Sequence, residues 1–355
     1  VAGFSVKAAV VPFHAWLPAA MVAPTPVSGL LHAVAVVKSG VFGIARVALD
    51  VFGPDLMKDL GVGLPLAAIA AFTLLTASVI ALRKDNLKRR LAYSTISQLS
   101  YIVLGLGVLS GDAIVGGLLH IPAHAFMKLT LFFCAGAIHV ETHTDNISDM
   151  AGIGKRMPLT MTAFAVAAAG MAGIPLVAGF VSKWYLLIGS VEAGQAIFAG
   201  ALLLSGMLNI AYFWPIVYQA FFESPEGHDE KPLLEGPFGG RFAVGDDTAD
   251  EKSVAADGGH EDESGDDRAH GENDPDPYDE SQHDSHLDAD VSDHLDGPGP
   301  GGWDDRRWNG EESTWFMLGP ILTAATGALA LGIAPAAFVF LRLVTLVAEN
   351  VGVVA

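Results

Sequence analysis

Long apolar runs alternate with short polar loops through most of this chain. Each run holds about 20 or more mostly apolar residues, the length that a helix needs to cross a bilayer. Backbone polar groups in lipid must be satisfied within the segment, so we predict helices rather than open strands. The pattern therefore predicts an all-α polytopic membrane protein, with eight spanning segments over residues 1–17, 26–52, 60–82, 91–109, 112–139, 159–189, 195–222 and 315–348.

Two of these segments carry helix breakers in the middle of an apolar run. Proline removes a backbone donor and clashes with the preceding helical turn. Broken helices at membrane depth are tolerated where they line a cavity, and transporters place ion sites there. A kink without function is the alternative for each break alone. The predicted breaks fall at Pro12 in the first segment and at Gly173, Pro175 and Gly179 in the sixth.

Charge is distributed very unevenly along the chain. The formal net charge is −19, yet residues 223–314 hold 29 acids and 6 bases, while the rest holds 10 acids and 14 bases. This stretch has too few large apolar residues to bury a core, so we predict a disordered acidic insert. Its acidity favours a halophilic source, because concentrated salt shortens the range of like-charge repulsion.

Basic loops predict the orientation in the membrane. Residues 82–91 carry five bases around one acid, and Lys155 and Arg156 follow two spans later. Positively charged loops lie on the cytoplasmic side, so both loops are expected there. The acidic insert comes another two spans on and is expected on the same side. The chain starts inside an apolar segment, and we expect that helices precede it.

Ionisable groups lie inside several predicted spans, where each costs several kcal/mol and is functional by default. Snorkelling toward a helix end is the alternative for any one of them, although Lys38 and Lys128 lie too deep for it. The candidates for proton transfer are Lys7, His32, Lys38, His120, His124, Lys128 and Lys183. His120, His124 and Lys128 recur every four residues, so they lie on one stripe of a helix and span about 12 Å. A hydrated stripe of this kind offers successive stops for a proton.

Polar residues of the preceding helix are placed to support such a chain: Ser94, Ser97 and Gln98. They could hold water or make interhelical hydrogen bonds. No Asp or Glu lies deep in these spans, so the buried lysines are expected to be neutral part of the time, or to pair with a carboxylate from elsewhere. The single cysteine, Cys134, excludes a cysteine metal cluster, and the histidines of the insert lack ligand spacing. We expect no metal and no cofactor.

At four places the motifs resemble the proton-conducting membrane transporter family. These are "KAAVVPFHAWLPAAMVAPTPVSGLLHAVAVVKSGVFGIAR", "LAYSTISQLSYIVLG", "HAFMKLTLFFCAGAI" and "GIPLVAGFVSKWYL". The family includes the large subunits of Mrp-type multisubunit Na⁺/H⁺ antiporters and the antiporter-like subunits of respiratory complex I. The resemblance covers roughly residues 1–220, and the first motif looks most like Mrp-type D subunits.

The resemblance implies a 14-helix fold with two inverted five-helix repeats, of which this chain looks like helices 7 to 14. Lys7 then resembles the lysine of broken helix 7, whose glutamate partner lies upstream. Lys38 resembles the bridging lysine of helix 8. His124 and Lys128 resemble the pair of ionisable residues on helix 11, and Lys183 resembles the lysine after the break in helix 12. The resemblance also implies that residues 1–52 end the first repeat and 53–222 form the second. Composition adds the acidic insert over 223–314, which the resemblance does not cover, and a C-terminal transmembrane helix in 315–355.

Three functions are compatible with these features. The first is a membrane subunit of a Na⁺/H⁺ antiporter, without catalytic chemistry of its own, that works with other subunits in the cytoplasmic membrane. The second is a proton-pumping subunit of a complex I type quinone oxidoreductase. The third is a structural scaffold, which the buried lysines disfavour. The sequence shows no dinucleotide, P-loop or nucleophile-elbow motif, and its bases are too few for nucleic-acid binding.

Overall fold

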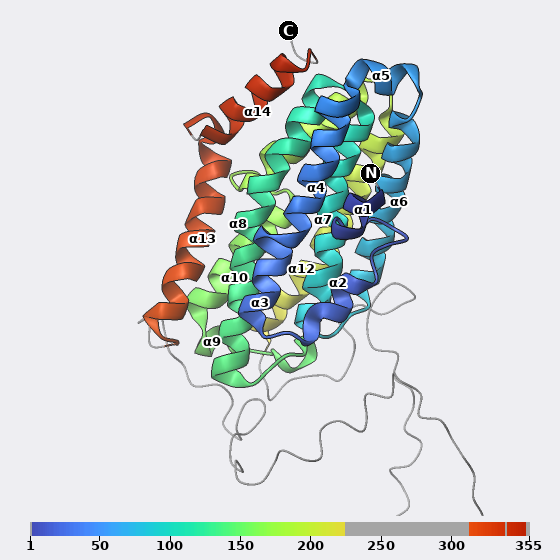
Figure 1. The fold of residues 1–355 in the computed structure, drawn as a ribbon. Coiled ribbons are helices and arrows are strands. Elements are labelled where there is room, and N and C mark those ends of the chain that lie inside the picture. The colour runs from blue at the N-terminus through green and yellow to red at the C-terminus, as the bar shows by residue number, and fades with distance from the viewer. Residues whose placement is uncertain (1, 224–311, 338, 353–355) are drawn as a thin grey trace, which may run out of the picture. The chain divides into compact units, whose positions relative to one another are not determined.

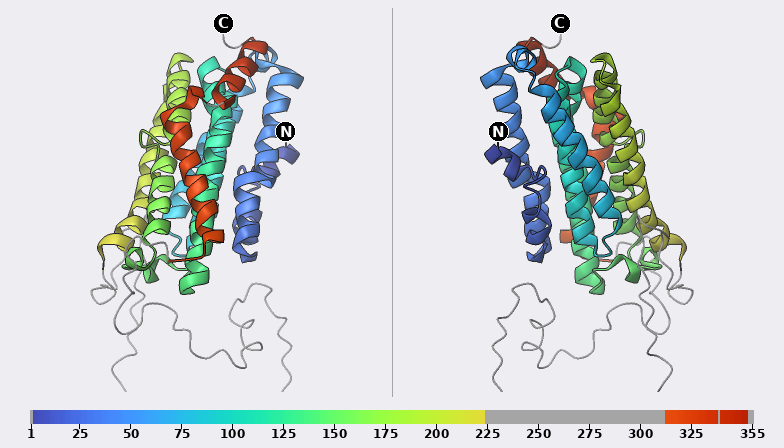
Figure 2. Two further views of the ribbon diagram at one scale, coloured as in Figure 1. Left: turned by 90° about the vertical axis from the view of Figure 1, so that its left-hand side faces the viewer. Right: turned by 90° about the vertical axis from the view of Figure 1, so that its right-hand side faces the viewer.

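Helix α7 (Leu87–Val108) forms the centre of the helical unit. The structure is a computed structural model that describes residues 2–223, 312–337 and 339–352. Within its apolar window, 94% of α7 is buried, whereas the neighbouring spans leave much more of their surface open. Figures 1 and 2 show α7 enclosed by other helices. Its neighbours are α4 (Val36–Arg46), α6 (Gly63–Leu82), α8 (Gly111–Thr142), α11 (Ala178–Glu192) and α12 (Ala196–Phe222).

Six helices of the described residues are long and apolar enough to span a membrane, which confirms the predicted all-α membrane architecture. One of them, Thr25–Phe52, runs through α3 (Thr25–Gly29), a π-helical stretch (Leu30–Val34), α4 and a second π-helical stretch (Val47–Phe52). The others are α6, α7, α8, α12 and α13 (Trp315–Ile333). Among the described residues no strand is formed, and Asn86 and Asn146 make a lone β-bridge. The chain is a multi-pass membrane protein.

The first predicted segment, over residues 1–17, is not one helix. Helix α1 (Ala2–Lys7) stops at Lys7, and turns occupy residues 8–15 before α2 (Trp16–Ala19) and a short 3-10 helix (Ala20–Val22). Pro12 lies in this interruption, so the predicted break is present. The backbone N–H of Val11 donates to the hydroxyl of Thr73 at 3.2 Å, which replaces a helical hydrogen bond that the break removes.

The predicted break in the sixth segment also divides a helix in two. Helix α10 (Pro158–Ala172) is followed by Gly173, whose φ of 93° lies in the left-handed region that glycine tolerates. Pro175 lies in the connection and α11 begins at Ala178. Gly179 was predicted as a breaker, and that prediction is wrong, because it lies in the first turn of α11. It is needed for packing instead, since a Cβ there would collide with the carbonyl oxygen of Gly170.

The prediction of a single C-terminal helix over residues 315–348 is wrong. Helix α13 ends at Ile333, a short 3-10 helix (Pro335–Ala337) follows, and α14 (Val339–Asn350) runs in a different direction (Figure 1). Pro335 cannot donate the backbone hydrogen bond that would continue α13. Helix α14 packs against α8 through Val344 and Ala348.

The remaining short elements join the spans at their ends. They are α5 (Pro54–Asp59), a 3-10 helix (Ile147–Asp149) and α9 (Ile153–Arg156). The loop before α7 lies beside the loop after α8, because Leu87 N–H donates to Asp145 O at 2.9 Å and Ile147 N–H donates to Asp85 O at 3.0 Å. The basic residues of the two loops therefore belong to one end of the helical unit.

Most of the acidic insert predicted over residues 223–314 lies outside the described residues. Its last three residues, 312–314, are described. Glu312 is 1% exposed and binds the first turn of α10. Its carboxylate accepts from the backbone N–H of Leu159 at 2.8 Å and of Thr160 at 2.7 Å, and from the Thr160 hydroxyl at 2.7 Å. Glu312 therefore belongs to the folded helical unit, two residues before the predicted end of the insert at residue 314.

Candidate functional site

Lys38 of α4 and His124 of α8 form the shortest contact between two buried ionisable side chains that come from different helices. Lys38 Nζ lies 2.6 Å from His124 Nδ1. Lys38 is 7% exposed and His124 is fully buried. A lysine and a histidine at this distance share one hydrogen, since one nitrogen must donate and the other accept. The pair can therefore exchange a proton without either side chain moving far.

His120 lies one helical turn from His124 and links two other helices. Its Nδ1 lies 2.7 Å from the Ser182 hydroxyl of α11, and its Nε2 lies 2.9 Å from Gln98 Oε1 of α7. The ring centroids of His120 and His124 are 6.0 Å apart. Pro122, which lies between them, does not interrupt α8. The stripe predicted from the four-residue spacing is thus present, and its first member also contacts α7 and α11.

Lys128 continues the stripe and is fully buried. Its ammonium donates to the hydroxyl of Ser94 on α7. It also lies 6.0 Å from the ring centroid of Phe132 and 5.9 Å from that of Phe213, distances at which an aromatic face attracts a cation. Ser94 and the two rings are therefore the stabilising groups that this cation has within the described residues.

Lys183 lies at the broken helix. Its ammonium donates to the backbone carbonyl of Met171 at 2.5 Å and lies 4.7 Å from the centroid of the Tyr101 ring. In an unbroken helix that carbonyl would accept from residue 175, which is a proline and has no N–H. The break thus frees an acceptor inside the membrane. Two further donors converge on it, Gln98 Nε2 at 3.3 Å and Asn209 Nδ2 at 3.1 Å.

Two of the predicted proton-transfer residues lie outside this network. Lys7 is exposed, and its backbone packs against Gly40 of α4. His32 is fully buried, yet neither ring nitrogen has a hydrogen-bond partner within the described residues. Its ring lies 4.9 Å from that of Phe132. The contacts described above therefore involve Lys38, His120, His124, Lys128 and Lys183. Lys7 lies apart from them, whereas His32 packs on the Phe132 ring that also lies beside Lys128 but makes no hydrogen bond to the series.

The supporting polar residues divide into two kinds. Ser94 and Gln98 contact predicted proton-transfer residues, as described above. Ser97 makes interhelical hydrogen bonds instead, at 2.8 Å to Ser78 of α6 and 3.4 Å to Ser205 of α12. These small hydroxyl-bearing residues let α6, α7 and α12 approach closely.

Two residues of this network, Asn209 and Tyr212 on α12, were missed from the sequence. Both are fully buried, and the Tyr212 hydroxyl donates to Asn209 Oδ1. The available signal was a lone asparagine inside the apolar run 195–222. A tyrosine in an apolar run does not indicate a buried polar contact in the same way, because tyrosine is common where spans meet the membrane–water interface.

Carboxylates take no part in this network as far as the described residues go. Ion pairs among the described residues include Arg46 with Asp50, Lys88 with Asp145 and His139 with Asp145. None of them involves Lys38, Lys128 or Lys183. The described residues also contain no group of His, Cys, Asp and Glu side chains arranged to hold a metal ion.

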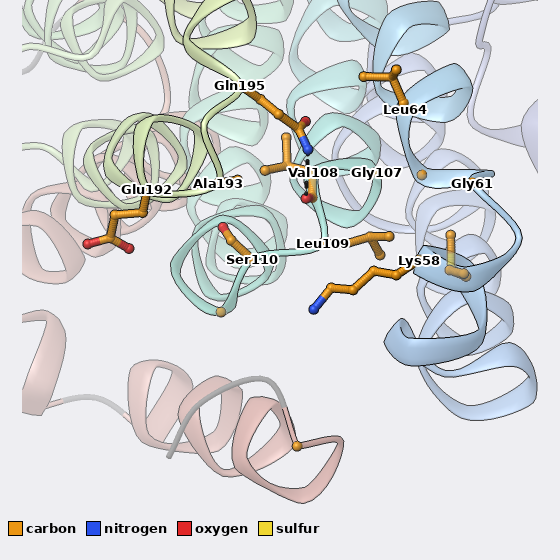
Figure 3. Close-up of a pocket in the computed structure, with 14 residues that line it drawn as sticks. Lys58, Gly61, Leu64, Gly107, Val108, Leu109, Ser110, Glu192, Ala193 and Gln195 are labelled. Atoms are coloured by element: carbon orange, nitrogen blue, oxygen red, sulfur yellow. Dashed lines mark hydrogen bonds between the residues drawn. The ribbon is translucent and has the colours of Figure 1, made fainter.

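Two hollows of the described residues differ in their relation to the network. Lys38 lines an apolar cleft of about 410 Å³ between α4, α8 and α14. A more polar hollow of about 540 Å³ lies where α6 and α8 begin and α7 ends (Figure 3). In it the Gln195 side-chain amide donates to the Val108 carbonyl at 3.4 Å, and Lys58 extends from α5 past Leu109 (Figure 3). None of the predicted proton-transfer residues lines this second hollow.

Known proteins resemble the chain in both sequence and structure. It is 40% identical over 243 residues to NADH-quinone oxidoreductase subunit N of Desulforudis audaxviator, covering 66% of this chain and 48% of that protein. It is 37% identical over 229 residues to a probable K⁺/H⁺ antiporter subunit of Rhizobium meliloti, covering 63% of this chain and 22% of that one. The chain thus spans about half or less of these relatives.

Among solved structures, a chain of the Mrp complex of a Dietzia species matches 98% of this chain with a TM-score of 0.69. The match covers 57% of that chain at 23% sequence identity, so it shows a shared fold. The profile of the family described as NADH:quinone oxidoreductase/Mrp antiporter, transmembrane, matches residues 1–208. On the strength of this match over more than half its length, the chain belongs to the NADH:quinone oxidoreductase/Mrp antiporter transmembrane family.

Proposed function

We propose that this chain is the proton-conducting part of a membrane subunit in a multisubunit Na⁺/H⁺ antiporter. The observation that carries the proposal is a series of ionisable side chains joined by polar side chains of α7, α11 and α12: the buried Lys38, His124, His120 and Lys128, and the half-buried Lys183. Such groups are expensive in a membrane and are retained where charge must move. Lysines and histidines in this setting can each release and regain a proton.

Proton movement along the series uses contacts that differ from step to step. A proton passes directly between Lys38 and His124, whose nitrogens lie 2.6 Å apart. His120 and Lys128 lie one helical turn on either side of His124, so water must complete those steps. Lys183 lies beyond Gln98 and the Met171 carbonyl, and it is the last group of the series in the described residues. Lys7 and His32 enter the proposal only as ionisable groups of the predicted spans, because neither makes a hydrogen bond to the other members of the series within the described residues.

The relatives favour two versions of this function. The probable K⁺/H⁺ antiporter subunit favours exchange of a monovalent cation for protons, and we propose Na⁺ as that cation. The NADH-quinone oxidoreductase subunits favour the second candidate, a proton-pumping subunit driven by a quinone oxidoreductase. In either version the partners are other membrane subunits and the location is the cytoplasmic membrane. The basic loops then face the cytoplasm, as does the acidic insert.

The test is Lys128→Ala in the complete subunit within its assembled complex. We expect coupled proton flux to fall to background while assembly is retained, because the change removes a proton-binding group and leaves the surrounding rings in place. Flux is measured in inverted membrane vesicles with a pH-sensitive dye, after addition of Na⁺ or of NADH. Lys58→Ala, an exposed lysine on α5, is the matched control and should behave like the unmodified protein.

The two energy sources separate the two versions of the function. Flux that follows a Na⁺ pulse without NADH supports the antiporter, and flux that requires NADH supports the oxidoreductase. Normal flux from the Lys128→Ala protein under both conditions would refute a role of this series in proton transport.

A further inference from the structure

Arg90 is a buried cation outside the proposed series. It lies near the start of α7 and is 8% exposed. Its guanidinium donates to three backbone carbonyls, that of Lys84 at 2.7 Å, that of Tyr212 at 2.9 Å and that of Leu82 at 3.5 Å. These carbonyls belong to the loop before α7, to α12 and to the end of α6. The side chain is therefore held in one place by three different segments.

Arg90 continues the stripe of α7 that faces the buried series. Ser94 and Gln98 follow it at intervals of four residues in one continuous helix, so the three side chains leave the same face. Gln98 Oε1 lies 2.9 Å from His120 Nε2. The Ser94 hydroxyl accepts from Lys128. Moving toward the start of α7 therefore follows the series from His120 to Lys128, and Arg90 is the next member of the stripe in that direction.

Helix α12 also places Arg90 close to Lys128. Tyr212 and Phe213 are consecutive residues of this helix. Arg90 donates to the carbonyl of the first, and the Lys128 ammonium lies 5.9 Å from the ring centroid of the second. The other two acceptors of Arg90 lie in residues 82–84, at the end of the helical unit where the two basic loops meet. Arg90 thus lies between Lys128 and that end.

A guanidinium differs from the lysines and histidines of the series, because it keeps its proton in proteins and cannot pass one on. Its fixed charge also opposes any second cation beside it. Arg90 and Ser94 are one helical turn apart, so the guanidinium and the Lys128 ammonium are roughly 10 Å apart, where an effective dielectric constant of about 20 gives a repulsion of roughly tenfold in population. On the loop side, Asp85 accepts from the backbone N–H and the hydroxyl of Ser148, at 3.1 and 2.8 Å, so this carboxylate is not inserted between the two cations. A fixed arginine is one of the devices by which membrane pores exclude protons and cations.

We propose that Arg90 closes the buried series at the end that carries the basic loops, by placing a permanent positive charge between Lys128 and the water on that side. The inference rests on the proposed function in proton transport and adds a residue that prevents an uncoupled leak. Protons then reach and leave Lys128 only through the other members of the series. The same charge keeps Na⁺ from entering at this end.

The test is the passive proton leak of proteoliposomes that contain the complete complex, driven by a pH difference with neither Na⁺ nor NADH added. Arg90→Gln removes the charge and keeps a hydrogen-bonding side chain. We expect its leak to rise about tenfold, the size of the repulsion that the charge supplies. Arg89→Gln is the matched control, because Arg89 is the neighbouring residue of α7 and is exposed, and its leak should equal that of the unmodified protein.

A double mutant distinguishes a charge barrier from loosened packing. If the leak runs along the series, combining Arg90→Gln with Lys128→Ala should remove the extra leak, since Lys128 is the first proton-binding group beyond Arg90. An extra leak that persists in the double mutant, or an unchanged leak in Arg90→Gln, would overturn the inference. If Arg90→Gln assembles poorly, citrulline at position 90 provides a neutral side chain of the same length as arginine, and a leak at the level of the control overturns the inference again.

The outcome is separable from that of the proposed function, because the leak is measured without coupled transport. If Lys128→Ala abolishes coupled flux while Arg90→Gln leaks no more than the control, only the role of Arg90 fails. If Lys128→Ala retains full coupled flux, the proposed proton route fails, whatever the leak of Arg90→Gln.

Discussion

Replacing Lys38 by arginine asks whether this residue passes protons or only supplies a positive charge. The lysine is 7% exposed and its nitrogen lies 2.6 Å from His124 Nδ1. Arginine keeps the charge and can still donate to that nitrogen, but it does not deprotonate in proteins. If Lys38 is a relay, Lys38→Arg should be nearly as damaging as Lys38→Ala. If Lys38 is a fixed counter-charge, Lys38→Arg should restore most of the activity.

The expected loss follows from what a positioned proton-transfer group contributes. Such groups accelerate proton transfer by roughly 10²–10⁴-fold, so we expect coupled flux to fall by at least about 100-fold in both variants. Arginine also brings five N–H donors to a site where His124 provides one acceptor. Each donor left unsatisfied costs about 1–3 kcal/mol, so the amount of assembled complex must be measured beside the flux.

The assay is Na⁺-dependent proton flux in proteoliposomes that contain the complete complex, normalised to the amount of complex present. Lys38→Met provides the reference for a side chain of similar length without a proton-binding group, and Lys58→Arg is the control for the substitution itself. A Lys38→Arg protein with most of the normal flux would refute the reasoning. The route would then have to pass around Lys38, and the short contact with His124 would only hold the histidine in place.

Two further predictions concern the C-terminal end of the acidic insert, at Glu312, and its middle, residues 236–302. Glu312→Ala should lower the free energy of unfolding by about 1–2 kcal/mol, the usual value of a lost helix N-cap. Glu349→Ala, an exposed glutamate on α14, is the control, and an unchanged melting temperature of the purified Glu312→Ala complex would contradict the prediction. Deleting residues 236–302 should leave coupled flux close to normal, because their composition predicts no apolar core. Loss of assembly in that deletion, seen on native gels, would show that the segment binds a partner.

The sequence by itself determined the membrane class, most of the spans and the identity of the buried charges. Apolar runs of sufficient length leave the backbone no alternative to a helix in lipid, so spans such as Gly63–Leu82 followed directly. The cost of an ionisable group in lipid is equally independent of the fold, and it made Lys38 and Lys128 candidates without any structure. Pro12 and Pro175 fixed the two interruptions, because a missing N–H is a local property.

Only the tertiary structure decided which of these groups meet. The four-residue spacing placed His120, His124 and Lys128 on one stripe, but spacing within a helix says nothing about which neighbouring helix faces it. The contact between Lys38 and His124 joins residues 86 positions apart, and that between Glu312 and Thr160 joins residues 152 apart. Asn209 and Gly179 acquire their roles only through packing, the first against the Met171 carbonyl and the second against Gly170. Such pairings depend on how the helices pack around α7, which no local pattern along the chain encodes.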